Sequence, residues 1–269
     1  MNSKSVLLTG SSKGFGLLFA EELSKQELTV YATAREPKNA HKLHELSEKY
    51  KNLKILKLDV LNHQEIDSVF EEISKTQGKT LDVLINNVGY GLVGRLEDLP
   101  LEEIKQQFET NFFSSVAMTQ KFLPLLNNIK DGGLIINISS IASFLGLPTM
   151  FAYSASKAAM DSFSMSVACE NTKDKLSVAT VHPGPYKTSF SDSAKRYGQI
   201  MESKNSFFQT QTDFQEVADL IVKLISLKSQ GKLKTYSKWP IGKKTKVFQL
   251  LCQYMPASWL TDLISKSTK

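Results

Sequence analysis

The amino-acid sequence predicts an α/β fold, a doubly wound parallel sheet with helices on both faces. Two observations carry this prediction. Short apolar runs rich in Val, Ile and Leu alternate with segments of helical period along most of the chain. These runs are continuously apolar, which is typical of strands that are buried on both faces. Parallel strands need crossover connections, so we expect each helix to return the chain over the sheet.

The expected elements follow one another without an internal repeat or a low-complexity linker. Strands are expected at 5–9, 28–34, 53–58, 81–86, 133–138 and 175–181. Helices are expected between them at 14–26, 38–50, 62–77, 101–127 and 153–171, followed by a helix at 213–228 and a short strand at 232–236. We therefore predict a single domain over residues 1–269, with its ligands beyond the carboxyl ends of the strands.

The alternation changes after Val181. Residues 182–212 mix Pro, Gly, Ser and aromatic residues without a period, which predicts a lid loop over a substrate site. We expect residues 213–269 to form a helical region that covers the substrate and ends in a tail. Apolar residues lie at helical spacing on both sides of Pro256, and they need a partner in the core, in another subunit or at a membrane surface.

The composition favours a globular enzyme. A chain of 269 residues with 41% hydrophobic and 22% charged residues is long and apolar enough for a large core. We expect a cytoplasmic protein, because the apolar runs are too short to span a membrane and the N-terminus lacks signal-peptide organisation. Cys169 and Cys252 belong to no motif, and His41 and His44 lack a third ligand, so no disulfide or metal site is predicted.

The positive charge of the chain is concentrated near its C-terminus. Of a net charge of +6, residues 220–260 contribute +8, with eight lysines and no Asp or Glu, and residues 1–219 carry −3. This distribution argues against a nucleic-acid partner, which would need a basic face on the main body. The lysines form either a solvated rim or a weak peripheral contact with anionic lipid, and an anionic substrate is a third partner for them.

A glycine-rich segment directly follows the first expected strand and opens the first helix. It reads Thr9-Gly10-Ser11-Ser12-Lys13-Gly14-Phe15-Gly16. Glycines permit a tight turn and a close approach of the backbone to a pyrophosphate, whose charge is stabilised by the helix N-terminus. The position between strand and helix is the context that a dinucleotide-binding motif requires.

The residue after the second strand favours NADP(H) over NAD(H). An acidic residue there would bind the ribose 2′-hydroxyl of NAD, but the chain has Arg35, whose guanidinium suits a 2′-phosphate. Lys13 in the glycine-rich segment adds a second cation. The alternative is that both residues are ordinary surface cations.

Tyr153 and Lys157 lie four residues apart in an expected helix and therefore share a face. A phenol titrates at about pH 10, and a neighbouring cation favours its ionised form, which suits acid/base chemistry. Because this pair also occurs on helices without function, it needs support from other residues. Ser140 lies thirteen residues before Tyr153, and Asn111 is an amide on a mostly apolar helix face, although it could simply cap a helix kink.

Taken together, these motifs resemble the short-chain dehydrogenase/reductase family, in its single-domain branch. The resemblance rests on the glycine pattern and on Asn86-Asn87-Val88-Gly89, Asn111, Ser140, Tyr153, Lys157 and Pro183-Gly184. Within the family the chain is similar to the group that contains 17β-hydroxysteroid dehydrogenase type 1 and the retinol dehydrogenases. The resemblance implies a Rossmann-type fold and a homodimer or homotetramer, with helices 101–127 and 153–171 at the interface.

The resemblance also implies roles for individual residues. Tyr153 would be the general acid/base, and Lys157, with the oxidised nicotinamide, would lower its pKa and bind the nicotinamide ribose. Ser140 would hold the substrate oxygen. Ser139 competes for this role, but a separation of thirteen residues from the tyrosine selects Ser140. Asn111 would hold a water that connects the lysine to solvent.

The residues expected to bind the cofactor come from several segments of the chain. They are Gly10, Ser12, Lys13, Gly14, Phe15, Gly16, Arg35, Asp59, Val60, Asn87, Gly89, Tyr153, Lys157, Pro183, Gly184, Tyr186 and Thr188. By resemblance, Asp59 and Val60 contact the adenine, and residues 183–188 hold the nicotinamide carboxamide. Val88, His182 and Tyr186 replace the family's usual Ala, Asn and small aliphatic residue, which indicates a tighter nicotinamide end.

We therefore predict an NADP(H)-dependent oxidoreductase, a carbonyl reductase or the reverse alcohol dehydrogenase. Its substrate would be a small molecule with a carbonyl or secondary alcohol and a bulky hydrophobic body. Apolar residues that flank the site motivate this choice, namely Phe144, Leu145, Leu147, Phe151, Tyr186 and Phe190. The alternative is a catalytically silent NADP(H)-sensing or scaffold protein, because a fold alone does not establish function.

Overall fold

The computed structural model describes residues 3–187, 193–198, 211–256 and 258–262. Its strands are β1 (Lys4–Leu8), β2 (Leu28–Ala34), β3 (Leu53–Lys57), β4 (Val83–Asn86), β5 (Leu92–Val93), β6 (Leu134–Ile138), β7 (Ser177–Pro183), β8 (Lys195–Arg196) and β9 (Tyr236–Ile241). Its α-helices are α1 (Gly14–Ser24), α2 (His41–Lys49), α3 (His63–Thr76), α4 (Leu101–Phe108), α5 (Ser114–Asn127), α6 (Phe151–Glu170), α8 (Gln215–Ser229) and α9 (Thr245–Tyr254). Three short helical segments are η1 (Pro37–Asn39), η2 (Glu109–Phe113) and η3 (Ile141–Phe144).

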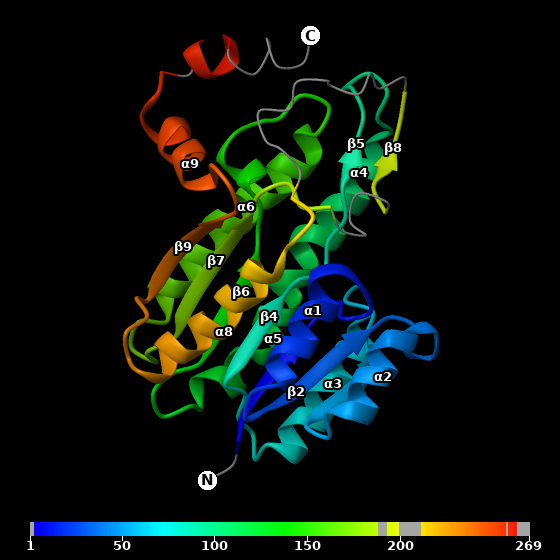
Figure 1. Ribbon diagram of the computed structural model, residues 1–269, viewed down its shortest axis with the longest axis vertical. Helices are drawn as coiled ribbons and strands as arrows, with labels where there is room; N and C mark the ends of the chain where they lie inside the picture. Colours follow the sequence, from blue (N-terminus) through cyan, green and yellow to red (C-terminus); the bar gives the residue numbers. More distant parts are fainter. Residues whose placement is uncertain (1–2, 188–192, 199–210, 257, 263–269) are drawn as a thin grey trace.

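Seven strands form one parallel sheet in the order β3-β2-β1-β4-β6-β7-β9 (Figure 1). The chain builds outward from β1 to β3, returns to β4 beside β1, and then builds in the other direction. This reversal makes the carboxyl ends of β1 and β4 the switch point of the sheet, where such folds bind ligands. The predicted doubly wound parallel sheet is confirmed.

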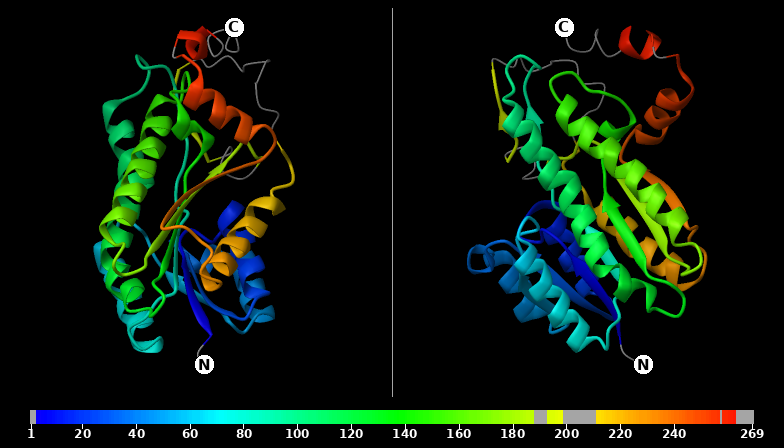
Figure 2. Two further views of the ribbon diagram at one scale, coloured as in Figure 1. Left: turned by 90° about the vertical axis from the view of Figure 1, so that its left-hand side faces the viewer. Right: turned by 180° about the vertical axis from the view of Figure 1, so that it is seen from behind.

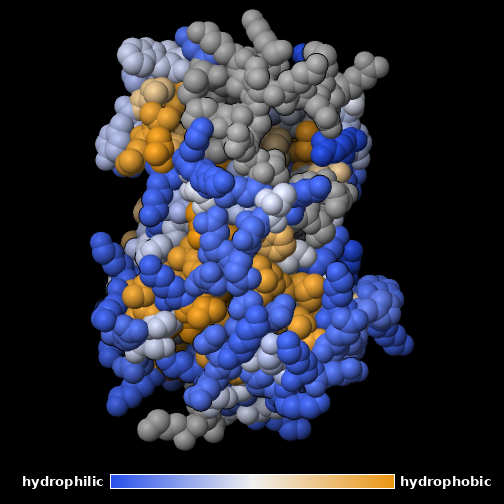
Figure 3. All heavy atoms as spheres, viewed as in Figure 1, coloured by the Kyte–Doolittle hydropathy of each residue, from blue (hydrophilic) through white to orange (hydrophobic). Residues whose placement is uncertain are grey.

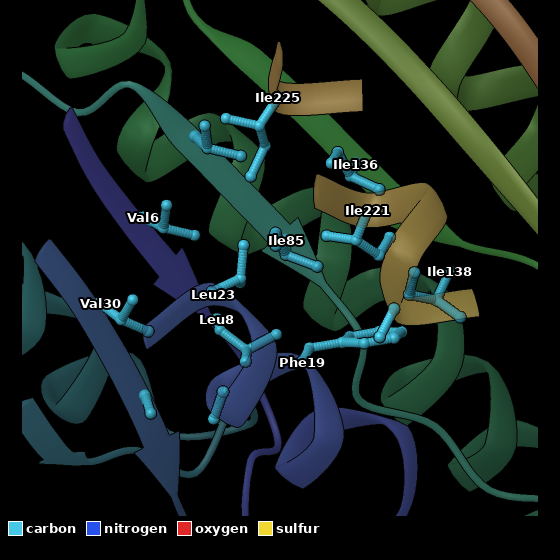
Figure 4. Close-up of a cluster of buried hydrophobic side chains, with 14 of the residues drawn as sticks. Val6, Leu8, Phe19, Leu23, Val30, Ile85, Ile136, Ile138, Ile221 and Ile225 are labelled. Atoms are coloured by element: carbon cyan, nitrogen blue, oxygen red, sulfur yellow. The ribbon is translucent and has the colours of Figure 1, made fainter. Parts of the chain in front are cut away.

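Helices cover both faces of the sheet, with α1, α2 and α8 on one face and α3, α5 and α6 on the other (Figure 2). Adjacent residues of β1 explain why its sequence is continuously apolar. Val6 and Leu8 pack toward α1 and α8, whereas Leu7 packs toward the opposite helices. Figure 4 shows the first of these cores, where strand residues meet Phe19 and Ile221 from the covering helices.

The expected helix over 101–127 contains a π-helical turn. It consists of α4, the π-helical η2 and α5, with helical backbone angles at both junctions. A π-helical turn holds one more residue than an α-helical one, and such turns are frequent at functional sites. Asn111 lies within it.

The C-terminal part keeps the expected order of elements but shifts their bounds. The helix expected at 213–228 is α8, and the last short strand is β9, which completes the main sheet. The last strand begins at Tyr236 instead of 232, because Gly231 and Lys232 donate backbone hydrogen bonds that close the end of α8. Pro240 lies in this strand, as edge strands permit. The short parallel pair of β5 and β8 was not predicted.

Three buried polar side chains join the centre of the sheet to α6. Asn86 donates from Nδ2 to Asn137 Oδ1 at 2.8 Å, and Asn137 donates to Ser164 Oγ at 2.8 Å. These side chains are almost completely buried. The ladder therefore fixes α6, which carries Tyr153 and Lys157, against β4 and β6.

Within the described residues, no helix is both long and apolar enough to cross a bilayer.

We expect Asn137→Ala to lower the free energy of unfolding by about 1–3 kcal/mol, because buried groups of Asn86 and Ser164 lose their partner. Urea unfolding followed by circular dichroism measures this change. Gln106→Ala, at an exposed position of α4, is the matched control. Equal stability of the two variants would contradict the account of the ladder.

Candidate active site

The glycine-rich segment forms a cradle at the carboxyl end of β1. Gly10 and Gly14 have φ angles of +69° and +58°, which favour glycine. A Cβ atom at Gly16 would lie 2.0 Å from the Gly10 carbonyl oxygen, so only glycine fits there. Asn87 holds the turn from the end of β4, because its Nδ2 donates to Thr9 O at 2.9 Å and to Gly10 O at 3.1 Å.

The groups around this cradle fit a dinucleotide. Helix α1 begins at Gly14, so its N-terminal backbone amides face the edge of the sheet where a pyrophosphate would lie. Arg35 follows β2, is exposed, and forms no ion pair with the described residues. Lys13 Nζ donates to Ser193 Oγ at 2.7 Å, and Ser12 is exposed beside it.

The expected adenine contacts lie after β3, in the next strand outward from β2. Val60 is buried, and Asp59 is half-buried. The Asp59 carboxylate accepts a hydrogen bond from Leu61 N at 3.0 Å, which fixes this turn. The carboxyl ends of β1, β2 and β3 thus bring the glycine cradle, Arg35 and the Asp59 turn to one edge.

The nicotinamide end follows β7, whose last residue is Pro183. Gly184 N donates to Ile241 O at 2.9 Å and so continues the sheet contact with β9. Tyr186 is buried, its ring meets the Phe15 ring edge-on at 5.7 Å, and its hydroxyl donates to Glu216 Oε1 at 2.7 Å. Burial, the largest cause, raises the pKa of Tyr186 further above its usual range.

Two residues expected to flank the substrate site have partners within the fold. The Tyr186 side chain packs in the core beside Phe15 and α8. Phe144 stacks on the His182 ring at 4.7 Å. Thr188 and Phe190 lie outside the described residues.

Tyr153, Ser140 and Lys157 converge beyond the carboxyl end of β6. Tyr153 and Lys157 lie one turn apart in α6, and the Lys157 ammonium is 5.9 Å from the centre of the Tyr153 ring. Ser140 caps η3 by accepting from Ala142 N at 3.1 Å and is hydrogen-bonded to the Tyr153 side chain. Lys157 Nζ donates to Ile138 O at 2.8 Å. These three residues therefore lie together, as their spacing in the sequence predicts.

Burial dominates the titration of this cluster. It raises the pKa of Tyr153 to about 12, against the opposing hydrogen bond with Ser140. It lowers the pKa of Lys157 to about 8, against the negative charge of Asp161. The protein's own groups thus shift the tyrosine in the opposite direction from the one expected of a neighbouring ammonium.

Asn111 connects the π-helical turn to the Gly89 loop and to α6. Its Oδ1 accepts from Tyr90 N at 3.0 Å, and its Nδ2 donates to Tyr90 O at 3.0 Å and to Ser156 Oγ at 3.3 Å. A Cβ atom at Gly89 would lie 3.3 Å from Asn111 Oδ1 and 3.4 Å from Lys157 Nζ. The amide therefore bonds to neighbouring segments instead of capping its own helix, and it lies close to the lysine.

Sequence reasoning missed Asp161, which lies one turn after Lys157 in α6. Its buried carboxylate accepts from His182 Nε2 at 2.9 and 3.0 Å and from Ser143 Oγ at 2.9 Å. Lys238 Nζ in β9 lies 3.4 Å from the same carboxylate. Burial opposes ionisation, but hydrogen bonding and positive charge outweigh it and lower the pKa of Asp161.

This carboxylate joins three segments that carry site residues: η3 after Ser140, the end of β7 before Pro183, and α6 itself. Two signals in the sequence could have revealed it. Asp161 shares the helix face of Tyr153 and Lys157, and His182 stands where the family usually has Asn. Ser139, the competitor of Ser140, is hydrogen-bonded to Asp161 and donates to Lys157 O at 3.4 Å, which makes it a structural neighbour.

An open groove of about 510 Å³ lies beside the start of α6. Its walls come from the turn after β5 and from the segment between η3 and α6, and its lining is Arg95, Leu96, Glu97, Leu147, Pro148, Thr149 and Phe151. Gly94 N donates to Thr149 O at 2.8 Å and joins the two walls.

The described residues hold no group of three His, Cys, Asp or Glu side chains suited to a metal ion.

Comparison with known proteins agrees with this geometry. Residues 4–197 match the model of the short chain dehydrogenase family. The chain is similar to a 3-ketodihydrosphingosine reductase of Bacteroides thetaiotaomicron, at 37% identity over 78% of this chain and 75% of that one. It is also similar to an NADPH-dependent 3-dehydrocapnine reductase of Ornithobacterium rhinotracheale, at 35% identity over 71% and 69%.

The solved structure of a short-chain dehydrogenase from Streptomyces avermitilis superposes with a TM-score of 0.83. The two chains are 27% identical, and the match covers 100% of this chain and 99% of the other. The matched span includes the glycine cradle, Ser140, Tyr153 and Lys157. The chain therefore belongs to the short-chain dehydrogenase/reductase family of oxidoreductases.

Proposed function

We propose that this protein is an NADP(H)-dependent oxidoreductase that interconverts a carbonyl and a secondary alcohol on a bulky hydrophobic substrate. One observation carries the proposal: Tyr153 is hydrogen-bonded to Ser140, with Lys157 one helical turn away, beside a glycine cradle that fits a dinucleotide. NADPH supplies the hydride when bound. The protein must supply the proton and the geometry.

The chain's own residues account for the proton. A raised pKa keeps Tyr153 protonated at neutral pH, so its hydroxyl can donate to the substrate oxygen during reduction and take the proton back during oxidation. Ser140 hydrogen-bonds the same oxygen and stabilises its developing charge. The charged form of Lys157 favours proton release from Tyr153. Asn111, close to Lys157, is placed to support the water that would connect the lysine to solvent.

The cofactor residues are those of the cradle and of the neighbouring strand ends. Arg35, an exposed cation after β2, suits the 2′-phosphate that distinguishes NADP from NAD. The relative from Ornithobacterium rhinotracheale is described as NADPH-dependent, which supports the same choice. A silent sensor of NADP(H) is the alternative, but it would not need the Tyr153 and Lys157 cluster.

A lipid-like ketone is the substrate class we favour. The groove beside Phe151 is lined mainly by apolar side chains and opens next to the start of α6, two residues before Tyr153. Two relatives are described as reductases of a 3-keto and a 3-dehydro compound, 3-ketodihydrosphingosine and 3-dehydrocapnine. These names favour a lipid ketone over the steroid or retinoid suggested by the narrower sequence resemblance.

A homodimer or homotetramer of a cytoplasmic protein completes the proposal. Phe113 in η2 and Met165 in α6 are about half exposed, and both lie in the helices expected at the interface. Phe112 meets Phe163 edge-on at 6.0 Å, so apolar side chains of η2 and α6 meet near these exposed residues. Light scattering after gel filtration measures the oligomeric state.

The catalytic proposal predicts that Tyr153→Phe lowers kcat for NADPH-dependent reduction of 3-ketodihydrosphingosine by about 10²- to 10⁴-fold, because the general acid is removed. NADPH oxidation at 340 nm measures turnover, and fluorescence titration checks that NADPH still binds. Tyr50→Phe, far from the cluster, is the matched control. Unchanged turnover of Tyr153→Phe would rule out the assigned role.

The cofactor proposal predicts that Arg35→Asp weakens NADPH binding by about 10- to 100-fold, since a charge-assisted contact is replaced by repulsion of the 2′-phosphate. Binding of NADH should change little. Lys38→Asp, an exposed change of the same charge in η1, controls for the general loss of positive charge. If both variants weakened NADPH equally, Arg35 would not read the 2′-phosphate.

The Asp161 contacts predict a change in the pH profile. With a pKa of about 8 for Lys157, kcat/KM for reduction should fall above about pH 8 as the lysine loses its proton. The negative charge of Asp161 raises this pKa, so Asp161→Asn should move the fall to lower pH. The other titratable groups at the carboxylate are His182 and Lys238, and the Tyr236 hydroxyl donates to the Asp161 backbone carbonyl.

Asp161→Glu retains the charge and should keep the alkaline fall of wild type even where kcat is reduced. If Asp161→Asn lost activity but its kcat/KM fell at the same alkaline pH as that of wild type, the role of Asp161 would be purely structural.

A further inference from the structure

Helix α9 has two apolar faces, and the protein uses one of them. Thr245 and Phe248 are buried, and the helix packs against η3 and β9. Val247, Leu250 and Tyr254 form a second stripe at spacings of three and four residues, and they are 56%, 54% and 75% exposed. Figure 3 shows apolar side chains gathered at the surface over α9, at the upper left.

The chain after α9 continues this exposed apolar surface. Residues 258–262 are helical, and Trp259 among them is 66% exposed. Exposed Trp and Tyr side chains are typical of helices that lie at a membrane interface, because both rings combine an apolar body with a polar group. If this surface faced only water, the side chains of Val247, Leu250, Tyr254 and Trp259 would remain hydrated, and this hydration costs free energy.

Positive charge borders the stripe, and the nearest acidic residue in the sequence is Asp262, at the end of the short helix that carries Trp259. Lys243, Lys244 and Lys246 are exposed at the N-terminal end of α9. No Asp or Glu occurs in residues 220–260, which carry eight lysines. A surface that is apolar at its centre and basic at its border complements anionic lipid, which offers headgroup charge above an apolar layer.

The same charges argue against a second copy on this face. In a symmetric dimer each face meets its own equivalent, so the lysines of α9 would lie close to those of the partner. Like charges across an interface are repelled and need compensating acidic groups. Residues 220–260, which include all of α9, contain no acidic residue.

The place of α9 in the fold connects the stripe to the site. The strands of the main sheet are parallel, so β9 ends at the same edge as β1, β4, β6 and β7. Helix α9 begins four residues after Ile241, the end of β9, and packs on η3, which starts one residue after Ser140 (Figure 1). A surface that bound α9 would therefore lie at the carboxyl edge of the sheet.

We propose that α9 and Trp259 dock the protein on an anionic lipid surface, with Val247, Leu250 and Tyr254 in the interface and Lys243, Lys244 and Lys246 at the headgroups. The docking is peripheral, and it brings the carboxyl edge of the sheet, with the catalytic residues, toward the lipid. It stands on the exposed stripe and the charge distribution, and it does not depend on which carbonyl compound the enzyme reduces.

Sedimentation with vesicles tests the proposal. The full chain should bind vesicles of phosphatidylcholine with 30% phosphatidylglycerol, bind pure phosphatidylcholine far less, and lose binding as salt is raised. Lys243→Gln, Lys244→Gln and Lys246→Gln combined should weaken binding to the anionic vesicles on the order of 100-fold. Lys42→Gln, Lys49→Gln and Lys51→Gln combined, an equal charge change at exposed positions near α2, should weaken it far less.

The apolar part of the contact has its own variant. Val247→Ser with Leu250→Ser should weaken vesicle binding at least about tenfold, and NADPH binding and thermal unfolding should remain as in wild type because both positions are exposed. Trp259 fluorescence should shift to shorter wavelength with anionic vesicles, and the shift should be absent in Trp259→Phe.

Three results would overturn the proposal: no binding to anionic vesicles, equal binding by both lysine triple variants, or dissociation of an oligomer by Val247→Ser with Leu250→Ser. The last result would assign the stripe to a second copy. Vesicle binding and NADPH turnover are measured separately, so failure of the docking leaves the proposed reaction standing, and the reverse also holds.

Discussion

Parallel pairing of the central strands is the constraint on which the site depends. Because β1, β4, β6 and β7 run in one direction and in register, their carboxyl ends meet at one edge. The residues at these four ends are the glycine cradle, the Asn87 loop, the Ser139–Ser140 turn and Pro183 with Gly184. Each of these strands is buried on both faces, so a one-residue shift of register would move every side chain into the opposite core and disrupt its packing, and the sheet thereby fixes the place of every site segment.

A few polar side chains are buried within this sheet framework. Their burial costs free energy, and their hydrogen bonds to one another offset that cost. Lys157 and Asp161 lie one turn apart on α6, almost fully covered, and Asp161 gathers η3 and the end of β7 around its carboxylate. An ionised group in such surroundings is stable only with close partners. The same network therefore positions Ser140 and Pro183 and sets how readily Lys157 keeps its proton.

The sequence predicted the sheet, the cradle and the Tyr153, Lys157 and Ser140 cluster, because each depends on local spacing or on continuous apolar runs. Long-range contacts could not be predicted in this way. The Tyr186 ring fills a space beside Phe15 that only the folded chain creates. The strand at 236–241 was misplaced, since hydrogen bonds at the end of α8 and its edge position, which tolerates Pro240, are tertiary features.

The free-energy cost of burying polar groups such as Lys157 and Asp161 also helps to distinguish an enzyme from a protein that only senses a nucleotide. The glycine cradle, α1 and Arg35 would hold the adenine half of the cofactor without Asn111, Lys157 or Asp161. Apolar residues at these positions would remove several buried polar groups and, in many proteins, leave stability equal or higher. Retaining an ammonium with a pKa of about 8 next to a buried phenol is useful where a proton must move. The arrangement of α6 therefore favours catalysis over silent binding.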